Sequence, residues 1–132
     1  MDKFNRGFDM DVYIQTLDPG LDRAVLRALQ YHVGQGASIR RRDLVNSVKH
    51  YIPDVRDRAI RLTINRLRKD GFPICSTGGV DGGYWIAANP AELDEYITRE
   101  LKSRALDLHE QIEALNSTRR AMWGDGVQVR LF

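Results

Sequence analysis

Residues 91–123 contain neither glycine nor proline, the two residues that most often end a helix. The segment immediately before them also favours a helix start. Asn89 can cap the helix, Pro90 suits the first turn, and Glu92 can reach back to complete a capping box. The sequence therefore predicts one long C-terminal helix over residues 89–123.

The predicted helix carries an apolar seam. Its apolar residues recur at alternating steps of four and three, and Arg119 takes the one remaining seam position. This spacing is typical of a coiled coil and extends over about three heptads. The seam residues predict a homodimer formed through the C-terminal helix; they are Leu101, Ala105, Leu108, Ile112, Leu115 and Met122.

Three shorter helices are predicted upstream. Asp18 and Pro19 resemble the cap and first position of a helix that runs to Val33, with an apolar stripe on one side. A second helix is predicted over 41–49, and Pro53 ends the helical pattern after it. A third is predicted over 54–69, with Asp54 as its cap and Ile60, Ile64 and Leu67 on its buried side.

Short strands are predicted around these helices. Residues 37–39 favour a single strand, while 72–76 and 84–87 favour two strands of a hairpin. The tip between them is rich in glycine, which accepts backbone conformations that other residues avoid. On the second strand, Tyr84 and Ile86 are expected to face the core. Trp85 points the other way, and we expect it to pack on the N-terminal arm or the long helix rather than to stack on a nucleobase.

The charge of the chain is unevenly distributed. The whole chain has a formal net charge of +2. Between Gly34 and Cys75, however, ten basic residues stand against four acidic ones, which leaves this segment at +6 and the rest at −4. A basic centre is consistent with a face that binds a polyanion. It is equally consistent with a solvated helix surface.

The order of the predicted elements and two local motifs resemble a known family. Residues 37–88 resemble the winged-helix domain of the biotin-repressor type, through RAIRLTINRLRKDGFPI (Arg58 to Ile74) and GGYWIA (Gly82 to Ala87). With the long helix attached, the chain also resembles small regulators often encoded by bacteria or their phages. The link from Lys49 to Val55 is longer than the tight turn of that family. The biotin-ligase domain of the namesake has no counterpart, so the resemblance implies no enzyme activity.

The resemblance implies a mainly α fold with a small β-hairpin wing, a winged helix-turn-helix followed by a long C-terminal helix. The third helix would be the recognition helix in the major groove, and residues 76–83 the wing on the backbone or minor groove. Arginine and asparagine can pair with guanine and adenine edges. Solvated surface is the alternative for each of them, and Arg66 is expected to be structural. The candidate DNA-binding residues are Arg40, Arg41, Arg42, Arg56, Arg58, Arg61, Asn65, Arg68 and Lys69.

Other chemistries find no motif in the sequence. Cys75 is the only cysteine, and it is expected to be a buried small hydrophobe rather than a redox switch. We predict no cofactor, no metal and no enzyme activity. The N-terminus has no apolar signal region, and no run of about 18 apolar residues is present to span a membrane. A cytoplasmic location, or the host cytoplasm for a phage protein, is therefore expected.

The predicted organisation has four parts: an N-terminal arm over 1–17 that docks on the core, a winged helix over 18–88, the dimerisation helix over 89–123 and a tail over 124–132. The leading hypothesis is a sequence-specific regulator of transcription that binds double-stranded DNA as a homodimer. The alternative is a winged helix that binds another protein, for example in a replication, transcription or host-defence complex.

Overall fold

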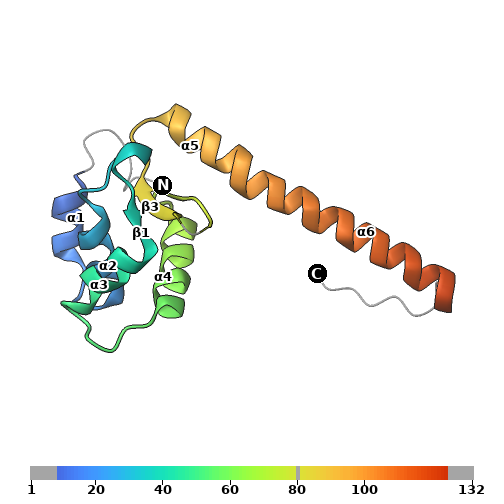
Figure 1. The fold of residues 1–132 in the computed structure, drawn as a ribbon, viewed down its shortest axis with the longest axis horizontal. Helices are drawn as coiled ribbons and strands as arrows, with labels where there is room; N and C mark the ends of the chain where they lie inside the picture. Colours follow the sequence, from blue (N-terminus) through green and yellow to red (C-terminus); the bar gives the residue numbers. More distant parts are fainter. Residues whose placement is uncertain (1–8, 80, 125–132) are drawn as a thin grey trace. The chain divides into compact units, whose positions relative to one another are not determined.

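The computed structural model describes residues 9–79 and 81–124. The chain is mainly helical, with a small three-stranded antiparallel sheet and a long C-terminal helix (Figure 1). It divides into two compact units, Met1–Glu95 and Tyr96–Phe132. The elements, in order, are α1 (Met10–Thr16), α2 (Leu21–Leu29), the 3-10 turn η1 (Gln35–Ala37), β1 (Ile39–Arg40), α3 (Arg41–Lys49), α4 (Asp57–Lys69), β2 (Ile74–Ser76), β3 (Gly83–Ile86), α5 (Pro90–Tyr96), the π-helical segment η2 (Ile97–Lys102) and α6 (Ser103–Trp123).

The core of the first unit lies between the helices and one face of the sheet. Helices α2, α3 and α4 contribute apolar sides at the predicted spacing, and Tyr84 and Ile86 add the inner face of β3, as expected. The predicted extension of the first helix to Val33 is wrong, because α2 ends at Leu29 and Val33 is 50% exposed. Burying a leucine or isoleucine side chain stabilises a fold by about 1.5–3 kcal/mol, so this cluster holds the helices in place. Its fully buried side chains include Val25, Leu26, Leu29, Leu44, Val48, Ile60, Ile64, Leu67 and Ile74.

The part of the predicted N-terminal arm that the structure describes is a helix docked on the core. Asp9 caps α1, where its carboxylate accepts hydrogen bonds from the backbone N–H groups of Asp11 (3.0 Å) and Val12 (3.4 Å). Ile14 is fully buried, and the rings of Tyr13 and Phe72 have centroids 5.4 Å apart. The helix α1 therefore contributes to the core. Residues 1–8 lie outside the described part.

Two predicted helix starts are wrong. Helix α2 begins at Leu21, after an extended Gly20 (φ 171°), and not at the Asp18-Pro19 pair. Helix α4 begins at Asp57, with Arg56 rather than Asp54 at its cap position. In the second case the chain first turns inward, where Val55 is 8% exposed and its N–H donates to the carbonyl of Ile52. Burial of Val55 thus moves the helix cap by two residues, from Asp54 to Arg56.

The sheet has the order β1-β3-β2, with both pairs antiparallel. All four residues of β3 are buried, so the sheet is covered on both faces. Trp85 is 3% exposed, which confirms that it packs within the protein. A side chain could not be added at Gly83, because its Cβ would lie 2.4 Å from the carbonyl oxygen of Ile39. Glycine at this position therefore allows β1 and β3 to approach closely.

The helix start predicted at Asn89 is confirmed. The Asn89 side chain accepts from the N–H of Glu92 (2.8 Å), and the Glu92 carboxylate accepts from the N–H of Ala88 (3.2 Å). The expected uninterrupted α-helix is wrong in one respect: residues 97–102 are π-helical, and α6 starts only at Ser103. Leu101 therefore falls in the π segment, and the α-helical part of the predicted seam runs from Ala105 to Met122.

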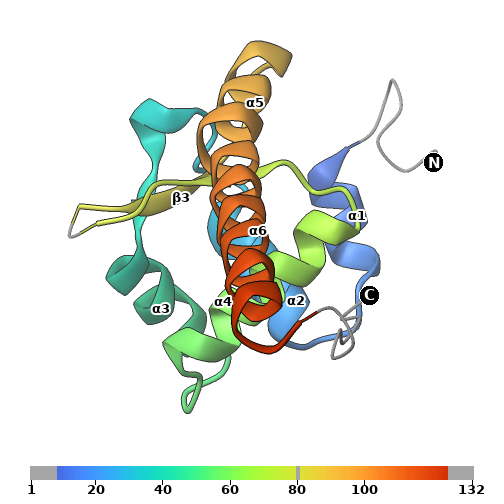
Figure 2. The ribbon, with the colours of Figure 1, turned by 90° about the vertical axis from the view of Figure 1, so that its right-hand side faces the viewer.

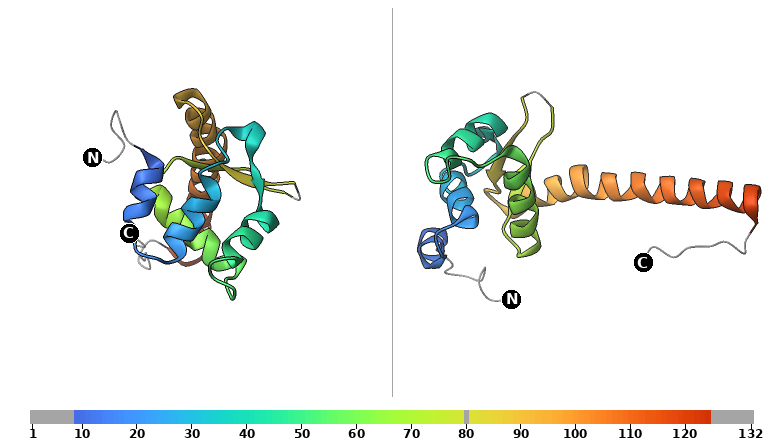
Figure 3. Two further views of the ribbon diagram at one scale, coloured as in Figure 1. Left: turned by 90° about the vertical axis from the view of Figure 1, so that its left-hand side faces the viewer. Right: turned by 90° about the horizontal axis from the view of Figure 1, so that it is seen from below.

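Helix α6 is a single straight helix that buries none of its residues (Figure 3, right). The apolar seam residues are solvent-exposed: Leu108 is 57% exposed, Leu115 69% and Met122 62%. Gly124 ends the helix with a positive φ of 80°. The rest of the predicted tail, residues 125–132, lies outside the described part. Among residues 9–79 and 81–124, no helix combines the length and the apolar character that crossing a membrane requires.

Candidate nucleic-acid interface

Helix α4 has one side in the core and one side in solvent. The buried side carries Ile60, Thr63, Ile64 and Leu67. The opposite side carries Arg58, Arg61 and Asn65, all exposed, as their spacing along the helix predicts. Leu62 lies on the exposed side as well, and it is 55% exposed. The residues predicted to read DNA bases therefore share one accessible face.

Two further arginines of α4 hold the helix in place. Arg66 forms an ion pair with Asp22 of α2, which agrees with its expected structural role. Arg68 was expected to contact DNA, but it reaches the sheet: its Nε donates to the carbonyl of Ile74 (2.7 Å) and its guanidinium to the Ser76 hydroxyl (3.0 Å). The side chain is half-buried. Arg68 thus links α4 to β2, a structural role that the spacing did not predict, and its DNA contact stays a prediction.

Arg61 already has a partner on its own helix. Its Nε lies 2.9 Å from a carboxylate oxygen of Asp57, one turn earlier, and both side chains are about half exposed (54% and 49%). An exposed pair of this kind contributes only about 0.3–0.5 kcal/mol to stability. The pair is therefore weak enough to exchange for a stronger acceptor, and it keeps the guanidinium on the accessible face.

Tyr84 shows that charged residues from several elements converge near the base of the hairpin. Burial raises the pKa of its hydroxyl, while the positive charges of Arg41, Arg68 and Arg61 lower it and Asp57 raises it further. Arg41 is the first residue of α3 and Asp57 is the first residue of α4. Arg61 lies one turn into α4, and Arg68 lies near its end. Sequence spacing assigned Tyr84 only to the core. Its ring is there, but its hydroxyl lies within the field of this cluster.

The basic residues at the start of α3 lie beside the hairpin. Arg40 ends β1 and is opposite Gly83 of β3 in the antiparallel register. Arg40 and Arg42 are exposed and Arg41 is half-buried, so all three have surface available for contact. The hairpin of β2 and β3 extends beyond the helices (Figure 2). The structure thus places the start of α3 next to the predicted wing.

The remaining candidates lie at the two ends of α4. Arg56 immediately precedes the helix and Lys69 is its last residue, and both are exposed. Eight residues separate Lys69 from Arg61, which corresponds to about 12 Å along a helix. Lys69 therefore lies apart from the cluster at the start of the helix, whereas Arg56 is adjacent to it.

The hairpin tip is described except for Val80. Gly79 has a positive φ of 91°, and its carbonyl accepts from the N–H of Gly82 (3.1 Å). A Cβ at Gly82 would lie 2.4 Å from the carbonyl oxygen of Thr77. Glycine is therefore favoured at both of these positions of the tip, which is where the predicted wing 76–83 would approach a ligand.

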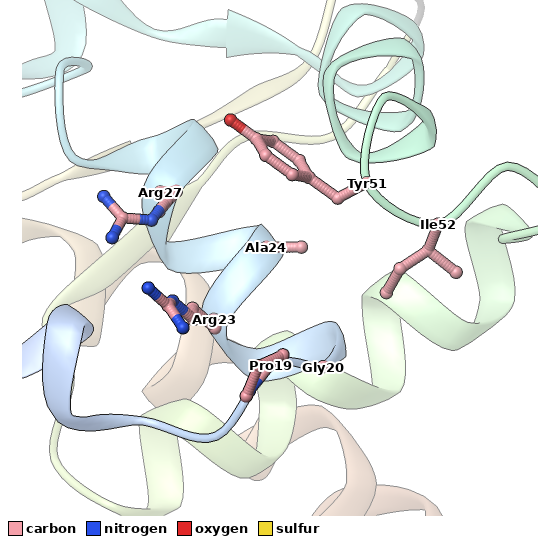
Figure 4. Close-up of a pocket in the computed structure, with 7 residues that line it drawn as sticks. All are labelled: Pro19, Gly20, Arg23, Ala24, Arg27, Tyr51 and Ile52. Carbon is pink, nitrogen blue, oxygen red and sulfur yellow. The ribbon is translucent and has the colours of Figure 1, made fainter.

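A separate hollow of about 320 Å³ lies between α2 and the segment after α3. Tyr51 and Ile52 face α2 across it, with the methyl group of Ala24 between them (Figure 4). Arg23 and Arg27 lie one helical turn apart along one edge. The hollow is open to solvent and involves none of the candidate DNA-binding residues.

Cys75 is fully buried in β2, as predicted. Burial, with a smaller contribution from the charge of Glu92, raises the pKa of its thiol to about 11, so the thiol stays protonated near neutral pH. Within the described ranges, no three side chains of histidine, cysteine, aspartate or glutamate come together as metal ligands would.

Comparison of the chain with protein-family models, with curated proteins and with solved structures found no match.

Proposed function

We propose that this chain is a winged helix-turn-helix protein that binds double-stranded DNA in a sequence-specific way, as a homodimeric regulator of transcription. The observation that carries the proposal is the exposed face of α4, where Arg58, Arg61 and Asn65 lie together on a helix whose other side is fixed in the core. A helix of this width fits the major groove of B-form DNA, and these side chains can pair with base edges there.

The arrangement of the other elements supports this proposal. The order of helices and strands through β3, and the pairing of β1 with β3 beside the hairpin, are those expected of a winged helix. Arg40, Arg41 and Arg42 flank the hairpin at the start of α3, where they would contact phosphates. Phosphate contacts would fix the register of the protein on the duplex while α4 reads the bases.

The dimer in this proposal rests on α6. An exposed helix with leucine, isoleucine and methionine at seam positions leaves apolar surface in water, and pairing with a second helix would remove it. A dimer would also match the two-fold symmetry of a palindromic DNA site.

One observation favours a different function, in which the same face binds a protein. Leu62 is 55% exposed among the arginines of α4, and an exposed leucine beside arginines is suited to a protein interface. In that case the affinity for duplex DNA would be low and would depend little on the face of α4.

Fluorescence anisotropy with labelled duplex DNA at low salt tests the proposal. The unmodified chain should bind, and the triple change Arg58→Ala, Arg61→Ala and Asn65→Ala should abolish binding to the preferred site. Arg27→Ala on α2 is the matched control, since it also removes an arginine but lies outside the proposed interface. Duplex affinity that is absent in the unmodified chain would refute DNA binding and favour the protein-interaction function. Affinity that is present but unchanged by the triple change would refute the exposed face of α4 as the part that reads the bases.

A further inference from the structure

The seam of α6 is regular enough to compare the two ways in which a second copy can pair with it. The seam positions from Ala105 onward alternate at steps of three and four within one unbroken α-helix. In a parallel pair each seam residue meets its own copy. In an antiparallel pair, heptad position a of one helix faces position d of the other, so each seam residue meets a residue from a different position in the sequence.

Arg119 distinguishes the two arrangements most clearly. In a parallel pair, Arg119 would lie against the partner's Arg119 inside the interface, and no acidic residue occupies the flanking positions Asn116, Thr118 or Trp123. Such a layer would place two like charges together away from water, which is costly. In the antiparallel pair, Arg119 meets the partner's Leu108, and its aliphatic stem can cover the leucine while the charged group reaches water.

Side-chain size gives the same answer. When Ile112 is placed opposite the partner's Leu115, Ala105 falls opposite the partner's Met122. A small residue then meets a large, adaptable one at both ends of the pair. The parallel pair would instead bring two alanines together, which leaves a gap, and two methionines together, which crowds the layer.

We infer that α6 binds α6 of a second copy in antiparallel orientation, with Ile112 opposite the partner's Leu115 and Ala105 opposite the partner's Met122. This inference rests on the homodimer of the proposed function and specifies its geometry.

Disulfide cross-linking tests the orientation. Ala105→Cys and Met122→Cys are made in two separate full-length chains that carry different tags and are co-expressed; both positions are exposed in the single chain. Cys75 can stay, because it is buried. In the antiparallel pair the two positions meet within disulfide range, so mild oxidation should give about tenfold more linked product for the mixed pair than for either variant alone.

Each variant alone supplies the control. Two copies of Ala105→Cys would be about 25 Å apart in the antiparallel pair and could not be linked. Efficient linkage of Ala105→Cys to itself would show a parallel dimer, which overturns the inference and leaves the homodimer intact. Light scattering on the unmodified chain tests whether a dimer forms at all. A monomer at tens of micromolar would overturn both the homodimer and this inference, but it would leave the proposal of DNA binding standing.

Discussion

Helix α4 buries four of its thirteen residues in the core, whereas α6 has twenty-one residues and buries none of them. The conformation of α4 is therefore fixed by tertiary packing, with ion pairs and hydrogen bonds at Arg66 and Arg68 in addition. Helix α6 depends on its own backbone hydrogen bonds, which stabilise an isolated helix only marginally. The difference shows that a stripe of apolar residues at helical spacing does not by itself reveal whether the partner lies in the same chain or in another.

Removing one apolar side chain from each helix tests this difference in packing most directly. Ile64→Ala should lower the free energy of unfolding by about 2–5 kcal/mol, because it opens a cavity in a packed core. Leu115→Ala should change it by less than about 0.5 kcal/mol at concentrations where the chain is monomeric. Urea denaturation followed by circular dichroism measures both. A large loss for Leu115→Ala at high dilution would show that α6 is packed within its own chain.

Charges placed on the seam test self-association next. Leu108→Asp together with Ile112→Asp should convert the proposed dimer to a folded monomer, because each substitution removes about 1.5–3 kcal/mol of apolar burial from the pair. Both residues are exposed in the single chain, so the first unit should keep its stability. Light scattering gives the mass and the far-ultraviolet circular dichroism gives the fold. An unchanged dimer mass would exclude this seam as the interface.

A smaller effect is expected at Arg68. Arg68→Ala should lower the free energy of unfolding by about 1–3 kcal/mol, because it removes hydrogen bonds from a charged group to Ile74 and Ser76. Arg58→Ala is the matched control on the exposed face and should change stability by less than about 0.5 kcal/mol. Thermal unfolding of the two variants makes the comparison. Unchanged stability together with lost duplex affinity would instead show that Arg68 contacts DNA.

The smallest expected difference is between two arginines of the proposed interface, one on α4 and one at the start of α3. Arg61→Ala should cost about 1–3 kcal/mol on the preferred site and relax the sequence preference, as expected for a base contact. Arg41→Ala should weaken all duplexes nearly equally and reduce the slope of log affinity against log salt by about one, as expected for a phosphate contact. Salt titrations on a preferred and a scrambled duplex separate the two. Identical behaviour of both variants would remove the distinction between α4 and the start of α3.

Local patterns predicted much of the fold correctly. The bounds 41–49 match α3, and Asn89 caps the helix that it was expected to start. The two hairpin strands overlap the predicted ranges 72–76 and 84–87, although Phe72 and Pro73 lie outside β2. In each case the deciding interaction lies within a few residues along the chain. The apolar sides of α2, α3 and α4 were predictable for the same reason, because helical spacing alone determines which residues share a face.

The predictions that failed, and the contacts that the sequence did not predict, depend on distant parts of the chain. The hydrogen bonds of Arg68 are an example of an unpredicted contact: spacing puts Arg68 near the line of Arg58 and Arg61, but β2 lies close to the end of α4 and accepts from its guanidinium. The start of α4 shifts because Val55 is buried first, although Asp54 is a good cap by type. The π-helical segment 97–102 contains no glycine or proline, so nothing in its sequence predicted the change of helix type. Residues alone do not specify these features until the neighbouring elements are known.

The buried thiol of Cys75 provides a chemical probe of how often the first unit opens. With a pKa of about 11, only a very small fraction of the thiol is ionised near neutral pH, and burial in β2 keeps reagents away even from that fraction. A thiol reagent can therefore modify the chain only when the part that covers Cys75 opens. The rate of that modification measures how often the thiol becomes accessible, without any added label. Because Cys75 is the only cysteine in the chain, the signal has a single source.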